Sequence, residues 1–287
     1  MKFLLLSLAL TMIWAASGAR AMNIEDAYRI GGFAVGTQSY TFREFTVLEA
    51  IEKTAKAGGR TFEFYPGQAF STDQPEVQWN HHASDEMIEE FEEHLERFGL
   101  LAVNYGVVGI SSDESEARQV FDFAQRLGLR GITTNSTGSL DTIEALVREY
   151  DIKVAFHNHP RRPNDPGYRL WDPEWLSGHL EGRDDRIGAC ADTGHWIRSG
   201  LNPVEALRAL DGRIMSLHLK DLNAPDSHDV ILGTGMGDIP GVLEELRRQE
   251  FTGHISVEYE HNWHESVPDV AQSIGFIRGY GIARGWE

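Results

Sequence analysis

Short apolar runs alternate with longer amphipathic segments from Gly32 to the end of the chain. An apolar run of about four to eight residues is typical of a strand, whereas apolar residues that recur every three or four positions indicate a helix with one buried face. We count eight such pairs. The predicted strands are FAVGTQ (33–38), RTFEFY (60–65), LLAVNY (100–105), RGITTN (130–135), IKVAFHN (152–158), RIGACAD (186–192), RIMSLHL (213–219) and HISVEY (254–259).

The segments between these strands carry the residues that start and stop helices. Ser84 precedes a segment with helical spacing of its apolar residues, and Gly99 stands at its C-terminal exit. Gly128 ends the next helix in the same way, and Asn202 followed by Pro203 marks another helix start. The chain is therefore predicted to repeat a strand and a helix.

Eight strand–helix units over residues 22–287 favour a single (β/α)8 barrel, a fold of typically about 250 residues. A doubly wound open sheet would produce a similar alternation, and the count alone does not separate the two. No Pro-rich or low-complexity linker divides the sequence, so we interpret it as one domain.

Metal-binding residue types stand at the C-terminal ends of the last four predicted strands. They are His157, Asp192, His218 and Glu258, spaced by 35, 26 and 40 positions. In a barrel, these strand ends converge on the face where active sites are built. Two imidazoles and two carboxylates suit zinc, manganese, iron or cobalt. The sequence therefore predicts a site for one divalent metal ion.

Further polar residues accompany the four predicted ligands. His159 lies two positions after His157, on the same side of an extended chain, and is expected to face a substrate pocket. His195 is expected beside it as a substrate-binding residue. Lys220 is a candidate for stabilising a developing oxyanion, and a surface pair with Asp221 is the alternative.

The first residues indicate export. Lys2, the apolar run FLLLSLALTMIWAA and the small residues of SGARA are typical of a secretory signal peptide over residues 1–21. A membrane anchor is the alternative, but a bilayer core needs about 20 apolar residues. We expect a protein that starts near Met22, is periplasmic or extracellular, and has no membrane partner after cleavage. The single cysteine, Cys190, forms no internal disulfide.

The formal net charge of −18 opposes association with nucleic acid and with anionic lipid. A small-molecule substrate is easier to accommodate. Acidic runs such as SDEMIEEFEEHLE are interpreted as solvated helix faces.

Four segments in the second half resemble a known family. ADTGHW (191–196), SLHLKD (216–221), GTGMGD (233–238) and SVEYE (256–260) are similar to the xylose isomerase-like TIM barrel family of sugar epimerases, isomerases and inosose dehydratases. The resemblance implies a divalent metal held by glutamate, aspartate, histidine and glutamate after strands five to eight. Asp192, His218 and Glu258 fill the last three places, whereas His157-Asn158-His159 stands where the family commonly has Glu-Asn-His.

This departure bears on mechanism. Family epimerases are thought to use the two glutamates as opposed acid–base groups, and here one of them is an imidazole. A neutral His157 with two carboxylates balances a divalent charge, which makes the ion a stronger Lewis acid. Our hypothesis is an isomerase, epimerase or lyase that acts on a keto-sugar or sugar derivative through an enediolate-type intermediate. Glu258, His157 and Lys220 are its candidate catalytic residues.

Other strand-end residues are candidates for sugar binding. Glu63 is expected to bind sugar hydroxyls or to support a pocket residue, with an edge salt bridge as the alternative. Tyr40 and Trp196 are candidate faces for a sugar ring. The segment NHPRRPNDPGYRLWDP (158–173), with its adjacent arginines, is a candidate lid for an anionic group. GTGMGDIP is expected to be a plain loop before a helix that begins near Pro240.

Two other functions compete with this hypothesis. One is an endonuclease-like phosphodiesterase, which the acidic charge and export disfavour. The other is a non-catalytic exported barrel that binds carbohydrate or metal, which the substituted glutamate keeps open. A homo-oligomer is expected only from the family resemblance.

Overall fold

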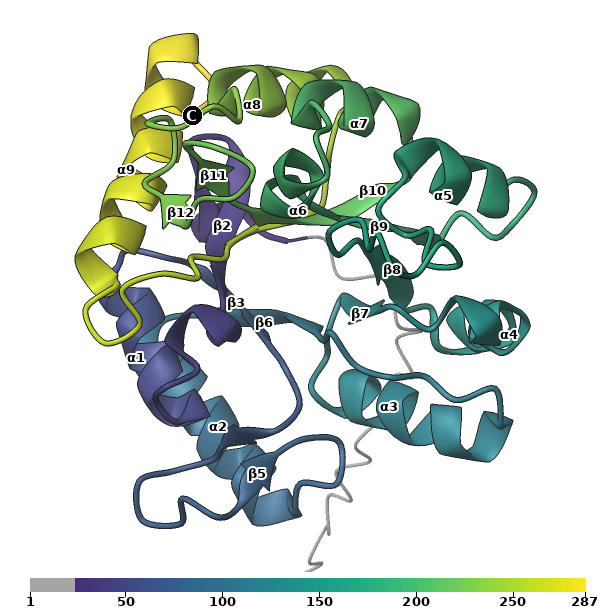
Figure 1. Ribbon diagram of the computed structural model, residues 1–287. Helices are drawn as coiled ribbons and strands as arrows, with labels where there is room; N and C mark the ends of the chain where they lie inside the picture. Colours follow the sequence, from purple (N-terminus) through teal and green to yellow (C-terminus); the bar gives the residue numbers. More distant parts are fainter. Residues whose placement is uncertain (1–23) are drawn as a thin grey trace, which may run out of the picture.

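A computed structural model describes residues 24–287, and the predicted signal peptide and the start near Met22 lie outside this range. Eight parallel strands form a closed barrel, because β2 pairs with both β3 and β13 (Figure 1). Closure excludes the open sheet and confirms the (β/α)8 barrel. The barrel strands are β2 Phe33–Gln38, β3 Thr61–Phe64, β6 Leu101–Tyr105, β7 Gly131–Thr134, β8 Lys153–His157, β9 Ile187–Asp192, β10 Ile214–Leu219 and β13 His254–Val257.

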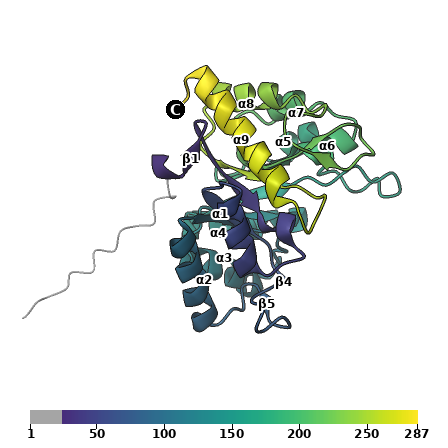
Figure 2. The same ribbon diagram turned by 90° about the vertical axis from the view of Figure 1, so that its left-hand side faces the viewer.

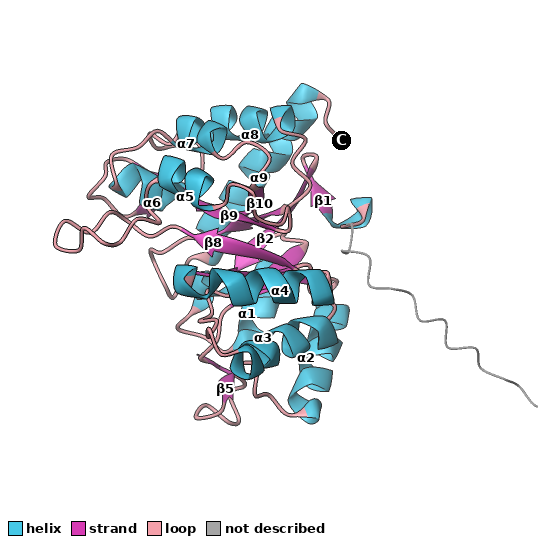
Figure 3. Cartoon of the chain, turned by 90° about the vertical axis from the view of Figure 1, so that its right-hand side faces the viewer, coloured by secondary structure: helices cyan, strands magenta, loops and turns pink. Residues whose placement is uncertain are grey.

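Helices surround these strands on the outside (Figures 1 and 3). They are α1 Val47–Lys56, α2 Asp85–Phe98, α3 Glu114–Arg126, α4 Leu140–Tyr150, α5 Pro173–His179, α6 Thr193–Arg198, α7 Pro203–Ala209, α8 Ile239–Arg248 and α9 Val267–Arg284. The predicted ends are confirmed: the Ser84 side chain caps α2, Gly99 follows it with φ of 66°, and Asn202 caps α7. Within residues 24–287, no helix has the length and apolarity to cross a membrane.

Three short antiparallel pairs were not predicted. They are β1 Arg29–Ile30 with β2, β4 Gln68–Ala69 with β5 Gln78–Trp79, and β11 Asp221–Leu222 with β12 Asp229–Val230. Each of these added strands is only two residues long, which is too short to produce a period in the sequence.

The last helix packs against the start of the described chain. Figure 2 shows α9 running past β1. Gly31 has φ of 59°, and a Cβ atom at this position would lie 2.4 Å from the Ile277 carbonyl oxygen. Glycine is required here by both the left-handed backbone and the close approach of α9.

Aromatic side chains fill the space between the barrel and the helices that follow its first strands. Trp79 stacks on Phe91 of α2 with ring centroids 4.4 Å apart, and Phe64 of β3 contacts both rings. These rings are fully buried. Because each buries a large apolar area, they anchor α2 against β3.

A buried carboxylate links α7 and α8. Glu245 of α8 is 3% exposed and accepts hydrogen bonds from Arg208 of α7 and from Arg248 and Gln249. The hydrogen bonds from Arg248, opposed by burial, lower the pKa of Glu245 to about 2.

We predict that Glu245→Gln lowers the free energy of unfolding at pH 7 by about 1–2 kcal/mol. This loss is smaller than the full pKa shift implies, because solvent screens Arg208 and Arg248, which are both half exposed. The folded-state pKa is depressed, so the contribution is complete above the ordinary value of 4.5 and disappears as the pH falls toward about 2. Urea unfolding of both proteins between pH 7 and pH 3 measures this loss. Glu181→Gln, an exposed change, is the control, and a pH-independent difference would contradict the assignment.

Candidate active site

Four buried side chains converge at the C-terminal ends of β8, β9, β10 and β13. His157, Asp192, His218 and Glu258 each offer one ligand atom, and these four atoms all lie within 4.8 Å of one another. The barrel thus brings together the four residues that the sequence proposed as metal ligands.

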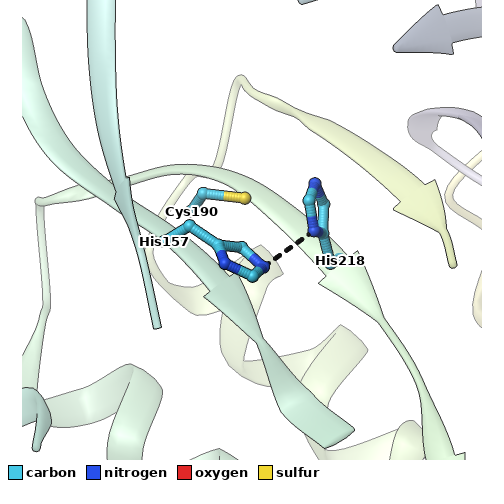
Figure 4. Close-up of side chains that lie close together, drawn as sticks. All are labelled: His157, Cys190 and His218. Atoms are coloured by element: carbon cyan, nitrogen blue, oxygen red, sulfur yellow. Dashed lines mark hydrogen bonds between the residues drawn. The ribbon is translucent and has the colours of Figure 1, made fainter. Parts of the chain in front are cut away.

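The contacts within this cluster are short. His157 Nε2 lies 3.0 Å from His218 Nδ1 (Figure 4) and 3.5 Å from Asp192 Oδ2. His218 Nδ1 also lies 3.1 Å from Glu258 Oε2. Nitrogen and oxygen atoms of the four side chains therefore face a common point.

Backbone hydrogen bonds fix the orientation of Asp192. Its Oδ1 accepts the His195 N–H at 2.7 Å, which caps α6, and its own N–H donates to Asn158 Oδ1 at 2.8 Å. Asn158 Nδ2 donates in return to the Asp192 carbonyl at 2.9 Å. Because Oδ1 is occupied by the cap, Oδ2 is turned toward the cluster.

Glu63 lies beneath His218, inside the barrel. It is fully buried and its Oε1 is 3.1 Å from His218 Nε2. Four other side chains also contact its carboxylate: Asn104, Thr133, His254 and Ser256. A carboxylate at Nε2 favours the proton on that nitrogen and leaves Nδ1 as a ligand. Glu63 therefore supports a cluster residue, and the edge salt bridge is wrong because the side chain has no exposed surface.

Lys220 is buried beside the cluster, with 1% exposure. Its Nζ lies 3.0 Å from Asp192 Oδ2 and 2.8 Å from Glu258 Oε2, and it also contacts Glu260. The alternative of a surface pair with Asp221 is wrong.

Asp221 instead accepts the backbone N–H groups of Gly233, Gly235 and Gly237. The GTGMGDIP segment is thus a loop before α8, as predicted, but a loop anchored on a buried carboxylate rather than a plain one.

Opposite charges keep the cluster carboxylates ionised. Burial opposes ionisation, but the Lys220 ammonium group, 3.0 Å from Asp192 Oδ2, holds the pKa of Asp192 well below its usual range. Burial likewise opposes ionisation of Glu258, yet Lys220 and His218 lower its pKa. Burial lowers the pKa of His157, so this imidazole is neutral and suited to bind a cation.

A cavity of about 360 Å³ opens onto the cluster. It is lined by Gln38, Tyr40, Tyr65, Val107, His157, His159, His195, Glu258 and Glu260. Burial and the neighbouring His157 lower the pKa of His159 to about 4, so this cavity residue is neutral at neutral pH. The expected pocket residues Tyr40, His159 and His195 therefore share one cavity with two of the cluster residues.

Two expected sugar-binding residues do not line this cavity. Trp196 is 1% exposed, because α6 starts at Thr193 and successive helical residues point about 100° apart, which turns Trp196 into the core while His195 faces the cavity. Glu63 does not line the cavity because it is fully buried inside the barrel. Gln38, Val107 and Glu260 line the cavity and were not proposed as binding residues. Of these, Gln38 carried the same strand-end signal as His157.

The donor set fits a divalent metal ion. Asp192 Oδ2 and His157 Nδ1 accept or donate no well-directed hydrogen bond within residues 24–287, although both are buried. Buried carboxylates are costly unless cations neutralise them. Asp192, Glu258 and Glu260 share the single ammonium group of Lys220, so a divalent cation would offset the remaining negative charge. Two imidazoles and two carboxylates are the ligands that zinc, manganese, iron and cobalt take.

The thiol of Cys190, on β9, lies beside the two histidines of the cluster. It forms with His157 and His218 a second group of ligand atoms within 4.8 Å (Figure 4). Burial raises the pKa of this thiol, which keeps it protonated, so the carboxylate-containing group is the stronger metal candidate.

Comparisons with known proteins give a consistent assignment. The model of the xylose isomerase-like TIM barrel family matches residues 51–280. An uncharacterised protein of Methanocaldococcus jannaschii is 28% identical over 153 residues, which are 52% of this chain and 49% of that protein. The rhizopine catabolism protein MocC of Rhizobium meliloti is 25% identical over 57% of this chain and 58% of its own. The chain thus spans about half the length of these curated relatives.

Solved structures match over most of the chain. An uncharacterised protein of Parabacteroides distasonis has 31% identity and a TM-score of 0.68, covering 86% of this chain and 99% of its own. A D-tagatose 3-epimerase-like protein has 19% identity, a TM-score of 0.67 and coverage of 88% and 98%. A xylose isomerase-like TIM barrel protein of Mycobacterium smegmatis, in complex with magnesium, has 13% identity, a TM-score of 0.67 and coverage of 91% and 99%.

We predict that Glu63→Gln weakens metal binding by about 10–100-fold, because an amide holds the His218 tautomer less strongly than a carboxylate. Competition with a chelating dye measures the affinity, and circular dichroism checks the fold. Glu245→Gln, a buried glutamate between α7 and α8, is the matched control. Parental affinity in Glu63→Gln would show that Glu63 does not orient His218.

Proposed function

The chain belongs to the xylose isomerase-like TIM barrel family, and from this premise we propose that it is a divalent-metal-dependent enzyme that isomerises, epimerises or cleaves a keto-sugar or sugar derivative. The observation that carries the proposal is the convergence of four ligand atoms within 4.8 Å at the floor of a cavity of about 360 Å³. His157, Asp192, His218 and Glu258 would hold the ion, which is manganese, zinc, cobalt or iron by ligand type.

A bound divalent ion supplies Lewis acidity to a substrate carbonyl or hydroxyl pair. The protein supplies the acid–base groups around it. Glu258 is ionised and lines the cavity, and neutral His159 and His195 lie beside it. Any of the three could accept a proton from the substrate carbon next to the carbonyl. We assign this transfer to Glu258.

Lys220 supports the same proton transfer from its position next to Glu258. Its ammonium group contacts both Glu258 and Glu260, and opposing carboxylates raise its pKa despite burial. It therefore remains charged and stabilises negative charge that develops near the floor of the cavity.

Aromatic rings also line the cavity. Tyr40 and Tyr65 line it with ring centroids 5.2 Å apart, and Trp263 lies edge-on to Tyr40 at 6.0 Å. The apolar face of a sugar ring packs well on such surfaces while its hydroxyl groups reach the polar wall. This division of the cavity supports a sugar as the substrate.

Export to the periplasm or the extracellular space, absence of a nucleic-acid partner and homo-oligomer formation remain proposals from the sequence. A non-catalytic binding barrel remains the competing function, since both functions use the same ligand cluster.

We predict about one equivalent of divalent metal in protein purified without chelators or metal columns, and a sharply reduced content in His157→Ala, because the variant loses one of four ligands. Inductively coupled plasma mass spectrometry measures both. His94→Ala is the matched control, since His94 lies on α2 away from the cluster and its ring hydrogen-bonds the Glu90 carbonyl. Full occupancy in His157→Ala would assign His157 to substrate binding, and absence of metal in the parent would reject the proposal.

We predict that the metal-loaded protein exchanges a carbon-bound proton of a keto-sugar with deuterated water and that Glu258→Gln slows this exchange at least about 100-fold, because the amide cannot accept the proton. Proton NMR of D-fructose, D-tagatose and D-psicose follows the exchange. Metal content is measured in parallel, so that loss of the ion is distinguished from loss of the base. Binding of sugar without exchange or turnover would instead favour the binding barrel.

A further inference from the structure

A second cavity lies in the long loop between β8 and α5. Its volume is about 240 Å³, and its lining includes Arg161, Arg162, Arg169, Tyr168 and Trp171 together with one carboxylate, that of Asp165. In Figure 2 this loop, drawn in teal, projects from the body of the barrel. Three guanidinium groups around one cavity stand out in a chain with a formal net charge of −18.

Two of these guanidinium groups are stacked on aromatic rings. Arg161 lies over the Trp171 ring at 5.0 Å and Arg162 lies over the Tyr168 ring at 4.1 Å. Stacking uses the faces of the guanidinium plane and leaves the in-plane N–H donors available. The rings thus hold two cationic groups in place without consuming their hydrogen bonds.

Carboxylates neutralise Arg161 and Arg162 less completely than they neutralise Arg169. Arg169 is paired with Asp172 at 2.9 Å, whereas Arg162 and Asp165 are 3.8 Å apart. For Arg161, no carboxylate lies within ion-pair distance among residues 24–287. A guanidinium fork with free donors binds carboxylate, sulfate or phosphate oxygens in a bidentate manner.

Hydrogen bonds tie this loop to the central cavity. The His159 N–H donates to Tyr168 Oη at 2.7 Å, so the ring beneath Arg162 also positions a histidine of the central cavity. The Arg161 N–H donates to Ser199 Oγ at 2.9 Å, and that hydroxyl donates to the His195 carbonyl at 2.7 Å. The backbone at Arg161 and the ring on which Arg162 stacks are therefore tied to the segments that carry the histidines of the central cavity.

We propose that this arginine cavity binds the anionic group of a charged sugar, such as a carboxylate or phosphate, while the sugar ring occupies the central cavity. The inference rests on the proposed function and narrows its substrate class from sugars to acidic sugar derivatives. The net charge of −18 repels an anion from most of the surface, so an anionic group would bind where clustered arginines make the local field positive.

The test compares neutral and anionic sugars with the same metal-loaded protein. Isothermal titration calorimetry is run with D-glucose, D-glucuronate and D-glucose 6-phosphate. We expect at least one anionic sugar to bind about tenfold more tightly than glucose, with a preference that weakens in high salt. The two anionic probes distinguish a carboxylate from a phosphate ligand.

The double variant Arg161→Gln/Arg162→Gln is expected to bind the anionic sugars no better than glucose. Arg97→Gln is the matched control, because Arg97 is an exposed arginine 5.4 Å above the Phe98 ring on α2. Retained preference in the double variant, or no preference for either anionic sugar in the parent, would overturn the proposal. Metal content and proton exchange with neutral keto-sugars, measured on the same preparations, report separately on the proposed function.

Discussion

Neutralisation of buried negative charge at one end of the barrel is the constraint on which the site depends. Glu63, Asp192 and Glu258 are buried there, and Glu260 lies at their edge. Lys220 contacts three of these four carboxylates, and His218 lies between Glu63 and Glu258. Buried ion pairs contribute little net stability compared with apolar packing, since desolvation offsets their attraction. A concentration of such groups at the strand ends therefore points to binding and chemistry rather than to folding.

The cluster residues and the side chains around them lie at different depths in the barrel. Glu63 and Cys190 lie inside the barrel, His218 and Lys220 lie above them, and Glu258 reaches the cavity. Because parallel strands leave their side chains in successive layers, the deeper residues can orient the upper ones without touching a ligand. The substitution of an imidazole for the family's first glutamate fits this arrangement, since a neutral His157 leaves Asp192 and Glu258 to balance a divalent charge.

The two cavities combine three kinds of surface from separate parts of the chain. Tyr40 and Tyr65 of the central cavity come from the first two strand ends, and its histidines and glutamates come from the ends of β8, β9 and β13. The separate arginine cavity lies in the loop after β8. Barrel closure through the pairing of β2 with β13 places the aromatic wall next to the ionic one. A substrate with an apolar ring face, hydroxyl groups and an anionic substituent would contact all three surfaces.

The sequence by itself determined the alternation of strands and helices, the helix ends at Ser84, Gly99 and Asn202, and the set of four ligand candidates. These features are local, because they depend on side-chain periods, caps and strand-end positions. Only the tertiary structure decided that Lys220 is buried and that Glu63 supports His218. It also decided that Trp196 faces the core and that the glycine loop is anchored on Asp221. Depth within a barrel and partners more than 100 residues away depend on closure and register, which no local pattern encodes.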